Sequence, residues 1–177
     1  NKLMSSLLLG CGLPGGMMGS MMADLAGIHS TINNIRKKKG EPELSTDDML
    51  INLFNEVEYV WPRVGYPPLV TPFSQYVKNI ALMNLLTMEQ GKGRFVMMDD
   101  SMWGMILGKS GKIPGTIAPE LVALAKEKGL EFTDADPHTL VQNNLEDFKK
   151  EMDENGWEYG QDNEELFELA MHPEQYR

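Results

Sequence analysis

The sequence contains one cysteine and three histidines, and both shortages exclude classes of site. Cys11 has no second cysteine to pair with, so no internal disulfide forms and no oxidising compartment is indicated. His29, His138 and His172 are isolated in the sequence, without the ligand spacing of zinc or other transition-metal sites. Surface or capping roles fit them better, and we expect this segment to bind no metal.

The chain also lacks an excess of positive charge and any long apolar run. Its formal net charge is -10, which argues against nucleic acid as a partner because such binding depends on cationic contacts to phosphate. No apolar stretch reaches the roughly 18 to 20 residues that a membrane-spanning helix needs, so we expect no direct membrane insertion. With 177 residues, the chain suffices for one well-buried core.

What the sequence does contain is helical periodicity through most of its length. Apolar residues recur every three or four positions, and caps and breakers such as Ser45, Asp99, Gly40 and Pro62 bound the segments. We therefore predict a mainly α fold. The expected helices are 17–39, 46–61, 72–88, 100–107, 119–128, a helix from 137 to about 152, and 164–173.

Two features allow a structural and a functional interpretation. Met17, Met18, Met21 and Met22 share one helical stripe; we interpret them as adaptable core rather than a promiscuous binding groove. Gly104 and Gly108-Lys109-Ser110 suggest a phosphate-binding loop, but three residues intervene where that motif needs four, and a helix precedes it instead of a strand. We interpret this stretch as a helix exit with a basic turn.

The C-terminal part is acidic, with eleven Asp and Glu between Glu146 and Glu174 against two lysines. Such a run usually forms a solvated face; a docking surface for a basic partner is the alternative. Trp157 and Tyr159 are aromatic residues that could anchor this tail on the rest of the domain.

The segment from Tyr66 to Gln75 carries the most specific pattern. Thr71-Pro72 precedes an apolar-periodic run, which predicts Thr71 as a helix N-cap and Pro72 as the first helical residue. The β-branch of Thr71 and the fixed backbone of Pro72 would hold the hydroxyl in one direction.

Four motifs together resemble the carboxyltransferase domain of biotin-dependent pyruvate and oxaloacetate enzymes: pyruvate carboxylase, the oxaloacetate decarboxylase alpha subunit and the pyruvate-side subunit of transcarboxylase. They are Leu13-Pro14-Gly15-Gly16-Met17, the Thr-Pro loop 64–72, the Gly-x-x-Gly-basic-x-Pro turn 108–115, and the closing helix 164–173. The Thr-Pro loop is the specific one. Gln75 follows the decarboxylase and transcarboxylase branch, since the carboxylases usually place lysine there.

The resemblance implies that this chain is the helical portion that follows a TIM barrel, which is absent here. The family's His-x-His metal pair and carbamylated lysine belong to that barrel, so the divalent metal would be bound there. We expect residues 1–177 to form a single helical domain or fragment. Within it, 1–13 would be a cut end that packs on the missing barrel, 14–108 the helical core with the Thr-Pro loop, and 109–177 the acidic C-terminal helices.

The resemblance also implies a function: moving a carboxyl group between oxaloacetate or pyruvate and biotin or carboxybiotin on a carrier domain. Thr71 matches the family's proton-transfer threonine, and a hydroxyl suits that role because it can give one proton while it takes another. Ser74 and Gln75 match positions that contact biotin. The segment alone is expected to be inactive.

The expected partners follow from the same resemblance: a biotin carboxyl carrier domain or subunit, the keto acids, and further copies in a homo-oligomer. The expected location is the cytoplasm, including the soluble side of a membrane-bound decarboxylase complex. One alternative is a non-catalytic helical module for carrier docking or oligomerisation. Another is an unrelated helical domain in which Thr71 is only a cap.

Overall fold

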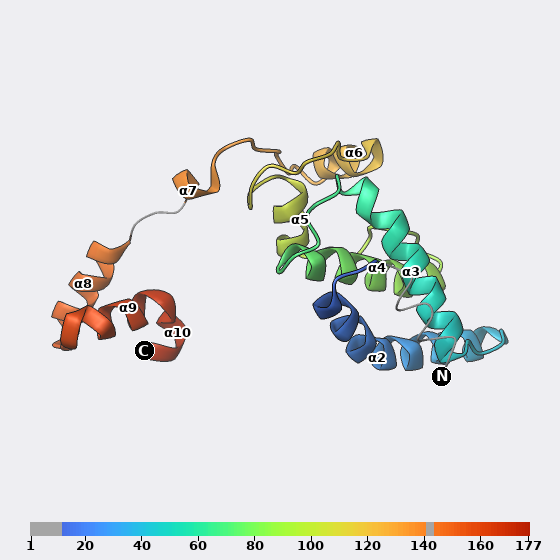
Figure 1. Ribbon diagram of the computed structural model, residues 1–177, viewed down its shortest axis with the longest axis horizontal. Helices are drawn as coiled ribbons and strands as arrows, with labels where there is room; N and C mark the ends of the chain where they lie inside the picture. Colours follow the sequence, from blue (N-terminus) through green and yellow to red (C-terminus); the bar gives the residue numbers. More distant parts are fainter. Residues whose placement is uncertain (1–11, 141–143) are drawn as a thin grey trace. The chain divides into compact units, whose positions relative to one another are not determined.

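The computed structural model describes residues 12–140 and 144–177, and in these ranges the protein contains helices and no β-strand (Figure 1). The predicted mainly α class is confirmed. The helices are α2 (Gly15–Lys39), α3 (Thr46–Arg63), α4 (Phe73–Glu89), α5 (Asp100–Ile106), α6 (Pro119–Glu127), α7 (Pro137–Leu140), α8 (Leu145–Asn155), α9 (Glu164–Met171) and α10 (Pro173–Tyr176), with a 3-10 turn, η1 (Gln161–Asn163), before α9.

Helix α2 follows its sequence signals closely. Met17, Met18 and Met21 are buried, which confirms that these methionines belong to the core. The helix ends at Gly40, whose φ of 74° lies in the left-handed region that glycine adopts without strain. Four basic residues occupy the last turn, where they stabilise the negative end of the helix dipole.

Helix α3 begins with a capping box. The Ser45 hydroxyl accepts the Asp48 N–H, and the Asp48 carboxylate accepts the Ser45 N–H in return, which satisfies two donors that the first turn leaves free. Pro62 was expected to stop this helix; it lies in the last turn, and the helix ends one residue later at Arg63.

Helix α4 is the centre of the N-terminal helices, and it packs against α2, α3 and α5 (Figure 1). Val77, Ile80 and Ala81 are fully buried on it. Because α4 touches three neighbours, the residues at its beginning are fixed relative to α2 and α3. This is how the fold positions the Thr-Pro loop.

Contacts divide the chain into two compact units, the first ending at Ala135 and the second comprising Asp136–Arg177. The turn after α5 lies in the first unit and is bonded to neighbouring loops: the Thr133 N–H donates to the Leu107 carbonyl, and the Gly115 N–H donates to the Gly65 carbonyl. The expected division of the chain at residues 108 and 109 stays a prediction.

The second unit corrects one expectation. The helix from residue 137 to 152 is not continuous, because Asn144 has non-helical backbone angles and α8 starts afresh at Leu145. Residues 141–143 of the expected helix lie outside the described residues, as does Cys11. Trp157 and Tyr159 pack within this unit, around buried Met152, Leu166 and Leu169.

Candidate functional site

The Thr-Pro loop is bonded to the Gly-x-x-Gly-basic-x-Pro turn, although the two motifs are far apart in sequence. Val64 and Ile117 form an antiparallel bridge, and the Gly115 N–H donates to the Gly65 carbonyl at 2.7 Å. Gly65 has φ 82°, and a Cβ there would lie 2.5 Å from Cγ2 of Ile113. Glycine is therefore required at this position on both conformational and steric grounds.

Trp61 fixes the next part of the loop. Its indole Nε1–H donates to the Pro67 carbonyl at 2.8 Å, and its ring meets Tyr66 edge-on with centroids 5.3 Å apart. Tyr66 has a positive φ of 54°, an uncommon conformation for a side chain of its size, and is 52% exposed. The loop thus leaves α3 in one defined path and presents an aromatic residue at its surface.

Thr71 is not the N-cap that the sequence predicts. The cap position of α4 is Pro72, with no side-chain capping bond, and the first helical residue is Phe73. The Thr71–Pro72 peptide bond is cis. The Thr71 side chain is exposed, and its hydroxyl makes no hydrogen bond within residues 12–140 and 144–177. The hydroxyl is therefore free to donate and to accept.

Ser74 and Gln75 lie in the first turn of α4 but in different surroundings. Ser74 is only 3% exposed, and its hydroxyl makes no hydrogen bond to the described residues. Gln75 is half-buried, and its Oε1 accepts a hydrogen bond from the Ser20 hydroxyl of α2 at 2.9 Å. The side chains of Thr71, Ser74 and Gln75 are not bonded to one another; the shared loop and helix start bring them together.

The backbone donors of this helix start are largely used internally. The Ser74 N–H bonds the Val70 carbonyl, and the N–H groups of Gln75 and Tyr76 both bond the Pro72 carbonyl. An incoming ligand would consequently meet side-chain donors here more than free backbone N–H groups.

One turn further along α4, Lys78 is buried, with 5% of its side chain exposed. Its ammonium donates to Asp24 Oδ2 and to Ser20 Oγ, each at 2.5 Å. A buried ammonium needs such a partner, because an unpaired charge away from water is strongly destabilising. Lys78 and Asp24 also line a groove of about 950 Å³ between α2, α4 and the segment 96–102. The proposed site residues Thr71, Ser74 and Gln75 do not line this groove.

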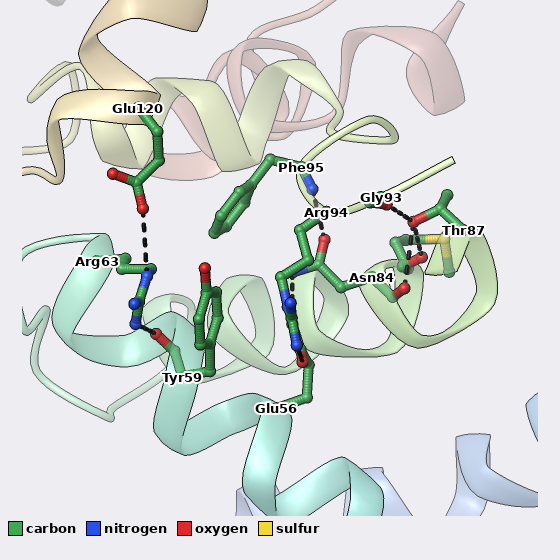
Figure 2. A network of polar contacts seen from close by, with 10 residues as sticks. Glu56, Tyr59, Arg63, Asn84, Thr87, Gly93, Arg94, Phe95 and Glu120 are labelled. Carbon is green, nitrogen blue, oxygen red and sulfur yellow. Dashed lines mark hydrogen bonds and ion pairs between the residues drawn. The ribbon is translucent and has the colours of Figure 1, made fainter. Parts of the chain in front are cut away.

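A second polar network includes side chains of α3, α4 and the loop after α4, and it is centred on Glu56 of α3 (Figure 2). The Glu56 carboxylate is 3% exposed and accepts hydrogen bonds from Arg94 Nε and Nη2 at 2.8 and 2.9 Å and from Asn84 Nδ2 at 2.8 Å. Asn84 Oδ1 in turn accepts the Phe95 N–H at 2.7 Å. The network joins α3, α4 and the loop after α4 into one body.

Tyr59 extends this network toward α6. The guanidinium groups of Arg63 and Arg94 lie 3.4 and 4.1 Å from the centroid of its ring, in the geometry of a cation–π contact. Arg63 Nε also donates to Glu120 of α6 at 3.2 Å (Figure 2). The hydrogen bonds to Glu56 raise the pKa of Arg94 above its ordinary value.

Comparison with known proteins assigns the chain to a family. The conserved carboxylase domain matches residues 10–177, almost the whole chain. The chain belongs to the conserved carboxylase domain family. The resemblance drawn from the four motifs is thereby confirmed. Three of these motifs meet in the first unit of the carboxylase domain: the helix that starts after Pro14 reaches the Thr-Pro loop's helix through Ser20 and Gln75, and the loop itself bonds to Gly115.

The relatives of this carboxylase domain are carboxylase and carboxyltransferase subunits. A pyruvate carboxylase subunit of Methanocaldococcus jannaschii is 30% identical over 166 residues, covering 92% of this chain and 25% of that protein. The methylmalonyl-CoA carboxyltransferase 5S subunit of Propionibacterium freudenreichii is 29% identical over 116 residues, covering 66% and 19%. A 2-oxoglutarate carboxylase large subunit of Hydrogenobacter thermophilus is 31% identical over 109 residues, covering 62% and 14%.

The carboxylase domain thus spans about a quarter of the length of the pyruvate carboxylase subunits that it matches. Within the described part of the chain, no three His, Cys, Asp or Glu side chains gather as metal ligands would. His29 lies with Nε2 2.7 Å from the Leu44 carbonyl oxygen, which is a structural contact to the chain that follows α2. None of the helices in the described ranges has the length and apolar character of a membrane span.

Sequence reasoning missed Glu56, Lys78 and Ser20. A signal was available for the first two: Glu56 lies between Leu53 and Val60 on the apolar stripe of α3, and Lys78 lies between Val77 and Ala81 on that of α4. A charged residue on a buried stripe indicates a buried ion pair. The partners, however, are 38 and 54 residues away, so only the fold identifies them.

Proposed function

We propose that this chain forms the helical side of a carboxyltransferase that moves a carboxyl group between oxaloacetate or pyruvate and biotin on a carrier domain. Thr71 is the proton relay in this proposal, and Ser74 and Gln75 contact the biotin ring. The observation that carries the proposal is the exposed Thr71 hydroxyl, which makes no hydrogen bond to the described residues and lies in a loop whose path is fixed by Gly65 and Trp61.

The chemistry of these side chains fits the biotin ring. A ureido group offers a carbonyl oxygen that accepts hydrogen bonds, and the Gln75 amide and Ser74 hydroxyl are donors. Gln75 Nε2 makes no hydrogen bond within the described residues, so that donor is available. Ser74 lies one residue before Gln75 in the same helical turn and is 3% exposed. When bound, biotin would supply the ring nitrogen that carries the carboxyl group.

The role of Thr71 is to move one proton without changing its own charge. Its Oγ1 accepts a proton from one reactant while its O–H is given to the other, so the hydroxyl is regenerated in each transfer. Because the Thr71 side chain is exposed, both reactants can approach its hydroxyl. The Thr71 backbone is held between a loop bonded to Trp61 and a helix packed on three neighbours, which preorganises the oxygen.

The decisive test is Thr71→Val in the complete carboxyltransferase, because valine keeps the shape of threonine without its hydroxyl. We expect carboxyl transfer to fall by about 10² to 10⁴-fold. The free energy of unfolding should stay unchanged, because the hydroxyl has no hydrogen bond to the described residues that the substitution could remove. Thr71→Ser, which retains a hydroxyl, should restore much of the rate. Thr116→Val is the matched control: Thr116 is also exposed and makes no hydrogen bond among the described residues.

Wild-type turnover in Thr71→Val would refute the relay. It would favour the alternative function, a non-catalytic module that docks the carrier domain or mediates oligomerisation. The observation behind that alternative is the exposed apolar surface beside Thr71, where Tyr66 is 52% and Val70 is 60% exposed. Val70→Ser would then weaken carrier binding while Thr71→Val left it unchanged.

A further inference from the structure

A chain of hydrogen bonds crosses from α2 to α4 and ends on Gln75. It runs from Asp24 Oδ2 to Lys78 Nζ, from Lys78 to Ser20 Oγ, and from Ser20 to Gln75 Oε1. The three bonds measure 2.5, 2.5 and 2.9 Å. Two of its members come from each helix.

The direction of these bonds is determined by Lys78. An ammonium has three donors and no acceptor, so Ser20 Oγ must accept from Lys78. The single O–H of Ser20 is then left to donate, and the acceptor in reach is the carbonyl oxygen of Gln75. If the amide were turned over, its NH₂ would face Ser20 and the Ser20 O–H would have no partner among the described residues.

The consequence appears at the other end of the amide. With Oε1 held by Ser20, Gln75 Nε2 is directed away from α2 and remains without a partner in the described chain. The half-buried position of Gln75 leaves this NH₂ as the donor that a ligand beside Thr71 would meet. Without Ser20, the amide is free to rotate and presents its oxygen or its nitrogen to that ligand.

The burial of Lys78 makes this arrangement stable. Its side chain is 5% exposed while that of Asp24 is 46% exposed, so the ammonium is enclosed and the carboxylate reaches it from the surface. A charge enclosed in this way keeps its partners. The ammonium therefore stays bonded to Ser20 and prevents the Ser20 hydroxyl from reversing its direction.

We infer that Ser20 is a positioning residue. Its hydroxyl accepts a hydrogen bond from Lys78 and donates one to Gln75 Oε1, which orients the Gln75 amide so that Nε2 faces the carbonyl oxygen of the biotin ureido group. The inference rests on the proposed function, because it specifies how one of the proposed biotin contacts is oriented. It adds three residues, Ser20, Asp24 and Lys78, to the determinants of biotin affinity.

The test is a double-mutant cycle in the complete carboxyltransferase, with oxaloacetate decarboxylation measured over a range of free biotin concentrations. Ser20→Ala should raise the KM for biotin about 3- to 10-fold, the effect of one hydrogen bond, with kcat changed less than about twofold. Gln75→Ala should raise KM at least as much. The double variant should equal Gln75→Ala alone, because Ser20 acts only through Gln75.

Two further variants separate positioning from packing. Ser20→Thr keeps the hydroxyl and should restore the wild-type KM. Ser30→Ala makes the same chemical change on the exposed side of the same helix and should have no effect. An unchanged KM in Gln75→Ala would overturn the proposed biotin contact itself. Two other outcomes would overturn the positioning role and leave the biotin contact in place. One is a raised KM in Gln75→Ala with an unchanged KM in Ser20→Ala. The other is a double variant in which the effects of the two substitutions add.

Discussion

The unit that ends at Ala135 and the unit Asp136–Arg177 both bury leucine and methionine, but they place their polar side chains differently. In the first, Glu56, Lys78 and Asn84 are buried and are bonded across helices. In the second, the described polar pairs lie at the surface, and two of them join residues three apart on α8. The first unit contains every proposed site residue.

This difference teaches what the buried polar groups contribute. Each requires one particular partner, since an unpaired buried group costs about 1 to 3 kcal/mol, so the helices of the first unit fit together in one arrangement. A surface ion pair contributes about 0 to 1 kcal/mol to stability, so it constrains the arrangement of the helices only weakly. The stability of the described part of the second unit depends instead on three buried side chains, Met152, Leu166 and Leu169.

The largest expected effect comes from the same substitution made in both cores. Leu169→Ala and Leu53→Ala each truncate a side chain with 0% exposure, a loss of about 3 kcal/mol. A core as small as that of the second unit rarely supplies more than about 3 to 5 kcal/mol. Leu169→Ala should therefore unfold Asp136–Arg177, whereas Leu53→Ala should only lower the denaturation midpoint of the first unit.

Limited proteolysis of the 177-residue chain, with the cuts mapped by mass spectrometry, checks this prediction. Leu169→Ala should become cleavable throughout the second unit while the first stays protected. Met171→Ala is the matched control, since Met171 is on the same helix and 69% exposed. Protection of the second unit in Leu169→Ala would mean that the small cluster is not what holds it.

The next effect tests the buried network of the first unit. Glu56→Gln keeps the size of the side chain but removes the charge and turns one acceptor into a donor facing Arg94 or Asn84 (Figure 2). Breaking a buried pair costs about 3 to 5 kcal/mol; because Arg94 is 36% exposed, we expect about 2 kcal/mol. Urea unfolding measures the loss.

Glu58→Gln provides the comparison for that experiment. Glu58 is two residues away on the same helix, exposed, and makes no contact with a charged partner in the described chain. It should change stability by less than about 0.5 kcal/mol. Equal effects of the two substitutions would show that the Glu56 network is no stronger than a surface pair.

Local signals predicted the helices well where a single residue decides the boundary. Ser45 and Asp48, Asp99, and Gly40 each act on backbone groups within four positions, and the helices start or end there as expected. Thr71 failed as a cap because the structure gives that position to Pro72, whose ring offers no side-chain acceptor. A Thr-Pro pair allows either arrangement, and the sequence does not distinguish them.

For the proposed site too, the sequence indicates residues but not their surroundings in the fold. The motif predicts Thr71, Ser74 and Gln75 as site residues, but neither the burial of Ser74 nor the Ser20 bond to Gln75 follows from it, because both depend on the packing of the folded helices. The contact between Gly65 and Gly115 likewise joins two motifs that the sequence presents separately. Periodicity predicts which face of a helix is buried; it does not predict which helix covers that face.

The smallest effect concerns a surface pair of the second unit, and it is seen as a pH dependence. Arg177 Nε and Nη2 donate to the two carboxylate oxygens of Glu151 at 2.6 and 2.8 Å, and these bonds lower the pKa of Glu151 below its ordinary value of 4.5. A lowered folded-state pKa contributes stability that is present above the unfolded-state pKa and lost as the pH falls through the folded-state pKa.

Arg177→Met should therefore destabilise the second unit slightly at pH 7, and its difference from wild type should shrink as the pH falls below about 4.5. Lys150→Met also removes one positive charge, and with it only a 3.8 Å pair to Asp147 in which both side chains are about three-quarters exposed. Thermal unfolding of both variants between pH 7 and 3 therefore separates the Arg177–Glu151 pair from net charge. A difference between Arg177→Met and wild type that stayed constant down to pH 3 would show that the pair contributes by packing and not by its charge.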